Sequence, residues 1–180
     1  MVIFDTDRLK FRTWNDQDVE PYFQINQDSQ VTEFLTGPLT YNQVFAFVFN
    51  ANNHFDKHGF TLWAVELKAT GELIGFIGLS YINWDAHFTP AVEIAWRLGT
   101  KYWGFGYATE GAKACLNFGF KCINLEEIVA FTVPSNVRSI HVMEKIGMLR
   151  DWNGDFAHPK LELTHPLSKH ILYRIKKCKL

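Results

Sequence analysis

The chain has 180 residues, a formal net charge of −1 at pH 7, and a composition that is 47% hydrophobic and 21% charged. This balance is typical of a globular protein and excludes a disordered chain. The length predicts a single domain, residues 1–180, since domains usually hold ~100–200 residues. A net charge near zero differs from the strongly basic charge that is typical of nucleic-acid-binding domains. The longest apolar run, residues 44–49, has six residues, whereas a membrane span needs about 20.

The charge is divided unevenly along the chain. Residues 1–90 hold 5 Lys and Arg against 11 Asp and Glu, whereas residues 91–180 hold 13 against 8. Such a division can steer a cation to one side and an anion to the other. The alternative is that the acidic residues form an ordinary solvated surface. The acidic residues nearest the first expected helix are Asp16, Asp18, Glu20, Asp28 and Glu33.

Two features of the chain predict a cytoplasmic protein. The N-terminus has neither a basic segment nor a long apolar stretch of the signal-peptide kind. Cys115 and Cys122 fall on one expected helix, where seven residues rise about 10 Å, too far for a disulfide. We therefore expect the cysteines to be buried thiols in a reducing compartment.

Hydrophobic periodicity predicts a series of strands and helices in the first half of the chain. Residues 8–13 alternate as a half-buried strand, and residues 15–26 read as a helix with Pro21 in its first turn. The capping box of residues 40–43 starts a second helix, whose apolar run 44–49 is expected in the core. Two apolar strands, 60–67 and 73–82, flank a hairpin turn at 68–72, and a further strand spans 92–98.

The second half predicts α/β alternation. Residues 107–122 form a helix, 128–133 a strand that Pro134 ends, and 136–146 a helix with Val137, Ile140, Met143 and Ile146 inward. A polar loop at 155–159 precedes the last strand, 170–175. The whole pattern predicts an α/β (mixed α+β) fold: a mixed sheet of about seven strands with helices on both faces.

The most informative segment is the glycine-containing turn between the strand 92–98 and the helix that follows it. It reads Gly99-Thr100-Lys101-Tyr102-Trp103-Gly104-Phe105-Gly106, and the helix begins at once. Free N–H groups and the helix dipole make a helix start an anion site. Gly104 and Gly106 allow positive φ and a close approach of phosphate to the backbone, and Lys101 adds a positive charge. The alternative is a tightly packed corner with no ligand.

Other ligand motifs fit poorly. No GxxxxGK[ST] sequence is present, so a P-loop is excluded. A dinucleotide fingerprint needs a third glycine where Thr109 stands, and the strand order does not suit a doubly wound sheet. His54 and His58 have helical spacing, but no Glu follows His54 directly as a zinc HExxH motif requires. We therefore expect no metal site.

Taken together, several segments resemble the GNAT family of N-acetyltransferases, in particular the branch of ribosomal-protein N-terminal acetyltransferases. The segments are Thr6–Arg12, Val92–Trp96, the turn Lys101-x-x-Gly104-x-Gly106 with Tyr107–Glu110, and Asn136–Ile140 with Glu144–Gly147. Each piece is weak alone, but the combination spans roughly residues 5–176. The resemblance implies a V-shaped mixed sheet whose two middle parallel strands splay apart to admit acetyl-CoA.

The resemblance also implies a set of cofactor-binding residues. The strand 93–98 is expected to pair with the pantetheine arm, and the turn to hold the pyrophosphate. The implied acetyl-CoA contacts are Ala95, Trp96, Arg97, Leu98, Lys101, Tyr102, Trp103, Gly104, Phe105, Gly106, Tyr107, Ala108, Thr109, Asn136 and Ser139.

Two residues are candidates for catalysis. Glu93 is a carboxylate on an otherwise apolar strand, where poor solvation raises a pKa into the range of a general base; the alternative is a salt-bridged Glu with no catalytic role. Ser139 follows Asn136 by three residues, so its hydroxyl can face the CoA sulfur or simply belong to a helix cap. Many family members carry a Tyr as proton donor to the thiolate where this chain has Met143.

The implied reaction is transfer of acetyl from acetyl-CoA to a primary amine by direct attack in a ternary complex. The acceptor is either a protein N-terminus or a small molecule, and Trp84 and His158 are candidates to line its pocket. Because the usual Tyr is missing, an inactive acyl-CoA-binding or regulatory domain is the alternative function. The expected partners are the amine substrate alone, with neither nucleic acid nor membrane, in a monomer or a homodimer.

Overall fold

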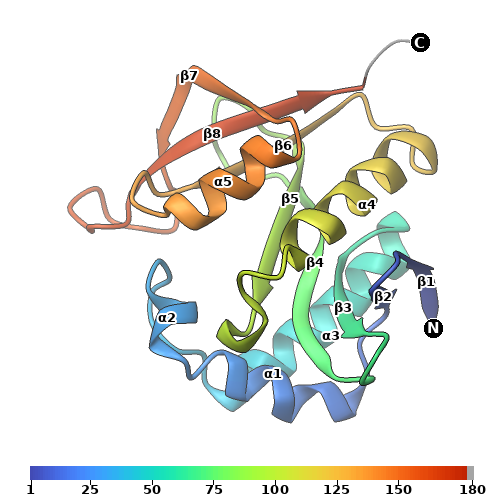
Figure 1. Ribbon diagram of the computed structural model, residues 1–180. Helices are drawn as coiled ribbons and strands as arrows, with labels where there is room; N and C mark the ends of the chain where they lie inside the picture. Colours follow the sequence, from blue (N-terminus) through green and yellow to red (C-terminus); the bar gives the residue numbers. More distant parts are fainter. Residues whose placement is uncertain (178–180) are drawn as a thin grey trace.

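A single eight-stranded sheet with helices on both faces organises the computed structural model, which describes residues 1–177 (Figure 1). In chain order the elements are β1 Val2–Asp5, β2 Leu9–Arg12, the 3₁₀ turn η1 Asp16–Asp18, α1 Val19–Ile25, α2 Ser29–Thr32, α3 Tyr41–His58, β3 Leu62–Leu67, β4 Leu73–Ile82, β5 Ala91–Leu98, η2 Thr100–Tyr102, α4 Tyr107–Lys121, β6 Glu127–Thr132, α5 Val137–Lys145, β7 Leu149–Ala157 and β8 Lys169–Lys176. The predicted mixed α/β architecture is confirmed.

The strand order explains why the sheet opens in its middle. The strands lie in the order β1-β2-β3-β4-β5-β6-β8-β7, and every neighbouring pair is antiparallel except β5 and β6. The pair β4–β5 stays in register over eight residue pairs, whereas β5 and β6 share a single pair, Glu93 opposite Val129. Beyond Glu93 the two parallel strands therefore separate, as Figure 1 shows for β5 and the elements around β6.

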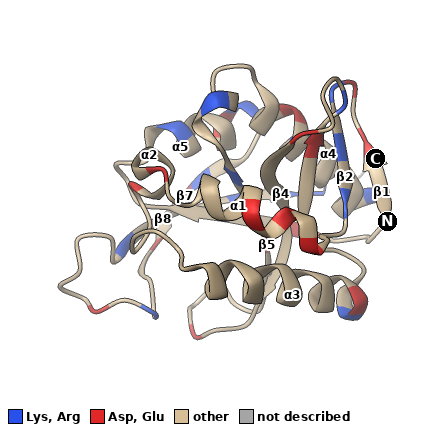
Figure 2. Ribbon diagram, turned by 90° about the horizontal axis from the view of Figure 1, so that it is seen from below, with Lys and Arg blue, Asp and Glu red and all other residues tan. Residues whose placement is uncertain are grey.

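Alternating side chains give the sheet two apolar faces. Ile77 points to the α4 side, where it packs with Leu9 and Phe11, and Phe76 points to the α1 and α3 side, where it packs with Tyr22. The N-terminal helices and α4 lie on opposite sides of the strands (Figure 2). Strand β4, which pairs with β5 over eight residue pairs, is thus covered on both faces.

Two glycines of β4 lie where another backbone comes too close for a side chain. A Cβ on Gly75 would stand 2.1 Å from the carbonyl oxygen of Arg97, and one on Gly78 would stand 2.1 Å from the carbonyl oxygen of Thr61. The sequence predicts this close approach from glycine inside a strand. The close approach keeps β3 and β5 tightly paired with β4, in the part of the sheet that ends at the opening between β5 and β6.

The N-terminal helices differ in part from the predictions. Residues 15–26 form η1 and then α1, because Asn15 and Asp18 close a capping box before the α-helix begins. Pro21 lies in the first turn of α1 as expected. In α3, Val44 and Val48 are buried, but Phe45 and Phe49 are 54% and 60% exposed. The expectation that the whole run 44–49 is core is therefore wrong for one face of the helix.

The C-terminal part also corrects two predictions. Residues 155–157 belong to the strand β7, which the sequence pattern does not reveal because its side chains are mostly exposed at the sheet edge. Val137 is 52% exposed, whereas Met143 and Ile146 are buried as expected. Val137 starts α5 directly after the cap residue Asn136, so it projects past the sheet. Val2–Asp5 adds the edge strand β1, and the sheet has eight strands rather than about seven.

Within residues 1–177, no helix combines the length and hydropathy that crossing a membrane requires. Cys115 is buried and Cys122 is exposed, and both are free thiols.

Candidate active site

A cavity of about 630 Å³ occupies the gap where β5 and β6 separate. Glu93 lies at the apex of the gap, since it forms the last pair between the two strands. The walls come from α2, β5, the glycine turn, the start of α4, β6 and α5. The predicted site residues that line the cavity are Glu93, Ala95, Trp96, Arg97, Leu98, Tyr102, Trp103, Gly104, Gly106, Tyr107, Ala108, Thr109, Asn136, Ser139 and His158. Segments far apart in sequence thus meet at one cavity.

The glycine turn is built as the sequence suggests. Gly104 and Gly106 have φ of +82° and +81°, and Gly106 is the cap residue before α4. Within residues 1–177, the N–H groups of Gly104, Phe105 and Gly106 donate to no acceptor. A Cβ on Gly104 would meet nothing within 4 Å, so the turn borders open space. Free N–H groups beside a helix start form an anion-binding concavity.

Contacts on both sides hold this turn in place. The indole N–H of Trp103 donates to the carbonyl of Leu98 at 2.8 Å, which ties the turn to the end of β5. The hydroxyl of Thr100 donates to the carboxylate of Asp28 at 2.6 Å, which ties it to the start of α2. These two hydrogen bonds fix the turn and its free N–H groups relative to β5 and α2.

Three predicted residues lie outside the cavity lining. Lys101 points away from the cavity toward Glu72, with an N–O distance of 3.4 Å. Phe105 is 60% exposed on the surface of the turn. Trp84 stands behind the lining and reaches it through ring contacts with Phe131 and His158. Arg8, from the loop before β2, contacts the turn and donates to the carbonyl of Phe105 at 3.0 Å.

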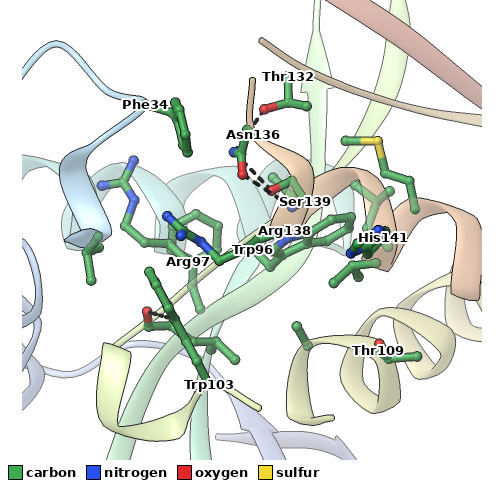
Figure 3. A pocket seen from close by; sticks show the side chains of 18 of the residues that line it. Phe34, Trp96, Arg97, Trp103, Thr109, Thr132, Asn136, Arg138, Ser139 and His141 are labelled. Carbon is green, nitrogen blue, oxygen red and sulfur yellow. Dashed lines mark hydrogen bonds between the residues drawn. The ribbon is translucent and has the colours of Figure 1, made fainter. Parts of the chain in front are cut away.

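Asn136 and Ser139 form the cap of α5 on the cavity wall (Figure 3). The amide oxygen of Asn136 accepts from the Ser139 N–H at 3.2 Å, and its amide nitrogen donates to Thr132 Oγ1 at 3.0 Å and to Ser139 Oγ at 3.2 Å. The capping alternative is thus observed, and it coexists with a place on the cavity wall. The Ser139 hydroxyl is held as an acceptor, which leaves its own proton to donate.

The Glu93 carboxylate is the strongest electrostatic feature of the site. The surrounding protein displaces water from it and raises its pKa from 4.5 to about 8, and the charge of nearby Lys160 opposes this shift only in part. Part of the side chain still faces the cavity, so a ligand can reach the carboxylate. A carboxyl group that titrates near neutral pH suits proton transfer.

Next to Glu93, the cavity has a wall of three rings, formed by Phe131, His158 and His170, which we call the three-ring wall. The ring centroids lie 6.1 Å apart for Phe131 and His158, 5.9 Å for Phe131 and His170, and 5.1 Å for the two histidines. Trp84 and Phe156 pack behind it.

Both histidines of the wall are held neutral. Desolvation is the main cause that lowers the pKa of His158 and of His170 below the usual 6.5. The Lys160 N–H donates to His158 Nδ1 at 3.3 Å, so the proton of that ring lies on Nε2. His170 Nδ1 lies 3.2 Å from the carbonyl of Ser168, so this ring carries its proton on Nδ1. One ring therefore offers a donor at Nε2 and the other an acceptor.

Arg138 crosses the cavity and joins its walls (Figure 3). Its guanidinium lies 4.6 Å from the Trp103 ring centroid and 5.7 Å from that of Phe34, and it pairs with the Glu33 carboxylate at 2.5 Å. We call this group the Arg138 clasp. It connects α5, the glycine turn and the segment after α2.

The five acidic residues near α1 do not line the cavity, although Figure 2 shows acidic positions gathered on η1 and α1. Asp18 is buried and binds Arg12 through both carboxylate oxygens, at 2.6 and 2.7 Å. Asp28 and Glu33 are bound to Thr100 and Arg138. Asp18, Asp28 and Glu33 are thus engaged by other residues of the protein and do not line the cavity.

Sequence reasoning missed several residues of the site: Phe34, Phe131, Arg138, His141 and His170. Arg138 lies within the segment 136–140 that carries the family resemblance but was given no role, and the other four belong to none of the quoted motifs. The one available signal is the alternation of β6 and β8, which places Phe131 and His170 on the same face as Glu93 once the strand order is known.

Comparisons with known proteins agree with this geometry. A model of the acetyltransferase (GNAT) domain family matches residues 8–149. The Bacillus subtilis protein YnaD, named an uncharacterized N-acetyltransferase, is 35% identical over 147 residues, which cover 81% of this chain and 82% of YnaD. A GNAT-family acetyltransferase structure from Bacillus anthracis is 31% identical and superposes with a TM-score of 0.77 over 98% of both chains. The chain therefore belongs to the GNAT family, as the sequence motifs suggest, and is an acetyltransferase.

A more distant structure shares the fold. The spermidine N-acetyltransferase of Vibrio cholerae, solved in complex with CoA and spermine, is 17% identical, with a TM-score of 0.73 over 95% of this chain and 96% of that one.

Proposed function

We propose that this acetyltransferase uses acetyl-CoA and transfers the acetyl group to a primary amine by direct attack in a ternary complex. The observation that carries the proposal is the opening of the sheet after Glu93, with the glycine turn at one end of the cavity and a near-neutral carboxyl group at its apex. Acetyl-CoA supplies the activated thioester.

The residues of the chain fit this cofactor at three places. The free N–H groups from Gly104 to Gly106 suit a pyrophosphate. The edge of β5 beyond Glu93 has no partner strand, so its backbone groups suit a linear amide-bearing arm. Asn136 and Ser139 line the opposite wall.

Glu93 is proposed as the general base. An ammonium has no lone pair, so the amine must lose a proton before it attacks. In the free enzyme the carboxyl group is mostly protonated at pH 7, and its ionised fraction rises through pH 8. A backbone N–H of β5 after Glu93 is the proposed donor to the thioester oxygen. The Ser139 hydroxyl is the proposed donor to the departing thiolate.

Met143, buried on the cavity wall, stands where many family members carry the Tyr that gives a proton to the thiolate. An inactive acyl-CoA-binding domain is therefore the second candidate function. Release of free CoA thiol, measured with acetyl-CoA and a panel of amines and N-terminal peptides, tests both. Amine-dependent release supports the enzyme. Acetyl-CoA binding by calorimetry without release for any amine would support the inactive domain and contradict the proposal.

A further inference from the structure

The strand register places the three-ring wall beside Glu93. Glu93 of β5 is opposite Val129 of β6, and Phe131 lies two residues further along the same face. Phe131 is in turn opposite Leu172 of β8, two residues from His170. Glu93, Phe131 and His170 therefore share one face on three adjacent strands, since directly paired residues point to the same side. His158, directly after β7, completes the wall.

This part of the cavity lacks fixed negative charge. Among the described residues that line the cavity, Glu93 is the sole carboxylate. The carboxylates closest in sequence to the α2 wall, Asp28 and Glu33, are already bound to Thr100 and Arg138. Near Glu93 the additional charge is the ammonium group of Lys160, which lowers the pKa of that carboxyl group. One ammonium can pair with Glu93, but a second one would meet neutral rings and a like charge.

We infer that the acceptor is a monoamine with an aromatic body, its amine at Glu93 and its body against Phe131, His158 and His170, and that polyamines are poor substrates. This inference rests on the proposed function, because it names the substrate class of the same site. Ring faces and edges attract another ring beyond the effect of apolar burial. A second ammonium in these surroundings would lose its hydration and meet ring faces and the neutral acceptor at His170 Nε2, but no second carboxylate among the described lining residues to balance its charge.

Two matched pairs of amines test the inference on the unaltered enzyme, by initial rates of CoA thiol release. Butylamine and putrescine have the same four-carbon chain and differ by one ammonium group. We expect kcat/KM for butylamine to exceed that for putrescine by at least ~10-fold, because the Lys160 ammonium repels the second ammonium group of putrescine. 2-Phenylethylamine and 2-cyclohexylethylamine carry the same ethylamine chain on a six-membered ring, and the flat aromatic ring of the first replaces the puckered saturated ring of the second. We expect the phenyl compound to be preferred about 3-fold.

Substitutions in the wall sharpen the test. His170→Asp adds a carboxylate beside Glu93, and we expect it to raise the ratio of putrescine to butylamine by about 10-fold. The matched control is Thr164→Asp, which adds the same charge at an exposed position of the β7–β8 loop outside the cavity. It should leave the ratio unchanged. Phe131→Leu should abolish the preference for the phenyl compound. Thermal melting verifies that each variant is folded.

The outcomes separate this inference from the proposed function. A putrescine or spermidine rate above that of butylamine in the unaltered enzyme would overturn the inference while leaving acetyl transfer to amines intact. Equal rates for the phenyl and cyclohexyl compounds would overturn the aromatic part. Absence of thiol release with every amine would overturn both the inference and the proposed function.

Discussion

The two ends of the cavity are built in different ways. The end at the glycine turn comes from one continuous segment, residues 99–109, whose free backbone N–H groups are the proposed phosphate site. The end at Glu93 comes from β5, β6, β8 and the residue after β7, and it depends on side chains. A backbone site tolerates many side chains, whereas an assembled site changes with each of them. We therefore expect substitutions of side chains to change acceptor choice more readily than the proposed use of acetyl-CoA.

The largest expected effect is at the Glu93 end. Glu93→Gln removes the proposed base but keeps the shape of the side chain, so kcat/KM should fall by ~10²-fold or more. The rise of kcat/KM toward pH 8, which follows ionisation of the carboxyl group in the unaltered enzyme, should be lost as well. Steady-state kinetics between pH 6 and 9 measure both.

The control for this variant is Glu126→Gln, since Glu126 is exposed and lies outside the cavity. Its rate should match that of the unaltered enzyme. A Glu93→Gln enzyme with normal kcat/KM at pH 7 would exclude Glu93 as the base and leave a water relay to bulk solvent in that role.

The same substitution should stabilise the fold at high pH. The pKa of Glu93 is raised in the folded state from 4.5 to about 8, so the unfolded chain releases its proton first. This group therefore costs stability progressively as the pH rises from 4.5 to about 8. Relative to its effect at pH 4.5, Glu93→Gln should raise the free energy of unfolding at pH 8 by roughly 4 kcal/mol, the linkage free energy of this pKa shift.

Urea unfolding at both pH values measures this difference. An equal gain at pH 4.5 and pH 8 would mean that the stabilisation comes from packing and not from titration of the carboxyl group.

At the turn, Gly104→Val should weaken acetyl-CoA binding. The φ of +82° strains a β-branched residue, and the new side chain would occupy the space in front of the N–H groups. We expect KM for acetyl-CoA to rise at least ~10-fold, corresponding to about 1.4 kcal/mol. We also expect the melting-temperature increase that saturating acetyl-CoA produces to disappear.

Gly71→Val is the matched control. Gly71 also has positive φ, +71°, and a Cβ there would also meet nothing within 4 Å, but the residue lies in the β3–β4 hairpin. It should destabilise the fold to a similar degree without changing the KM for acetyl-CoA. Equal effects of both variants on that KM would argue against a phosphate site at the turn.

The smallest expected effect concerns the ion pair between Arg138 and Glu33 in the Arg138 clasp. Arg138 and Glu33 are about half exposed, with side-chain exposures of 53% and 49%. Their coupling energy in a double-mutant cycle of Glu33→Gln and Arg138→Gln should stay below ~1 kcal/mol, as for other exposed pairs. Thermal unfolding of the two single variants and the double variant measures this energy. A coupling above ~2 kcal/mol would contradict the low energy expected of this half-exposed pair.

The predictions from sequence succeeded where a local rule applies. The capping box at Thr40 and Gln43 and the positive φ of Gly104 and Gly106 are confirmed. The sequence did not reveal the short edge strand β1, the single-turn α2 or the mostly exposed β7. Such elements carry little hydrophobic periodicity, because most of their side chains do not face the core.

The sequence by itself determined the family and the glycine turn, because a backbone site leaves its mark in one continuous run of residues. It also singled out Glu93 as a carboxylate on an apolar strand. Tertiary structure alone decided that Lys101 turns toward Glu72 and that the acidic residues near α1 bind Arg12, Thr100 and Arg138. It likewise decided that Phe131, His158 and His170 meet beside Glu93. The reason is that strand order and register set these contacts between distant segments, and no local pattern encodes them.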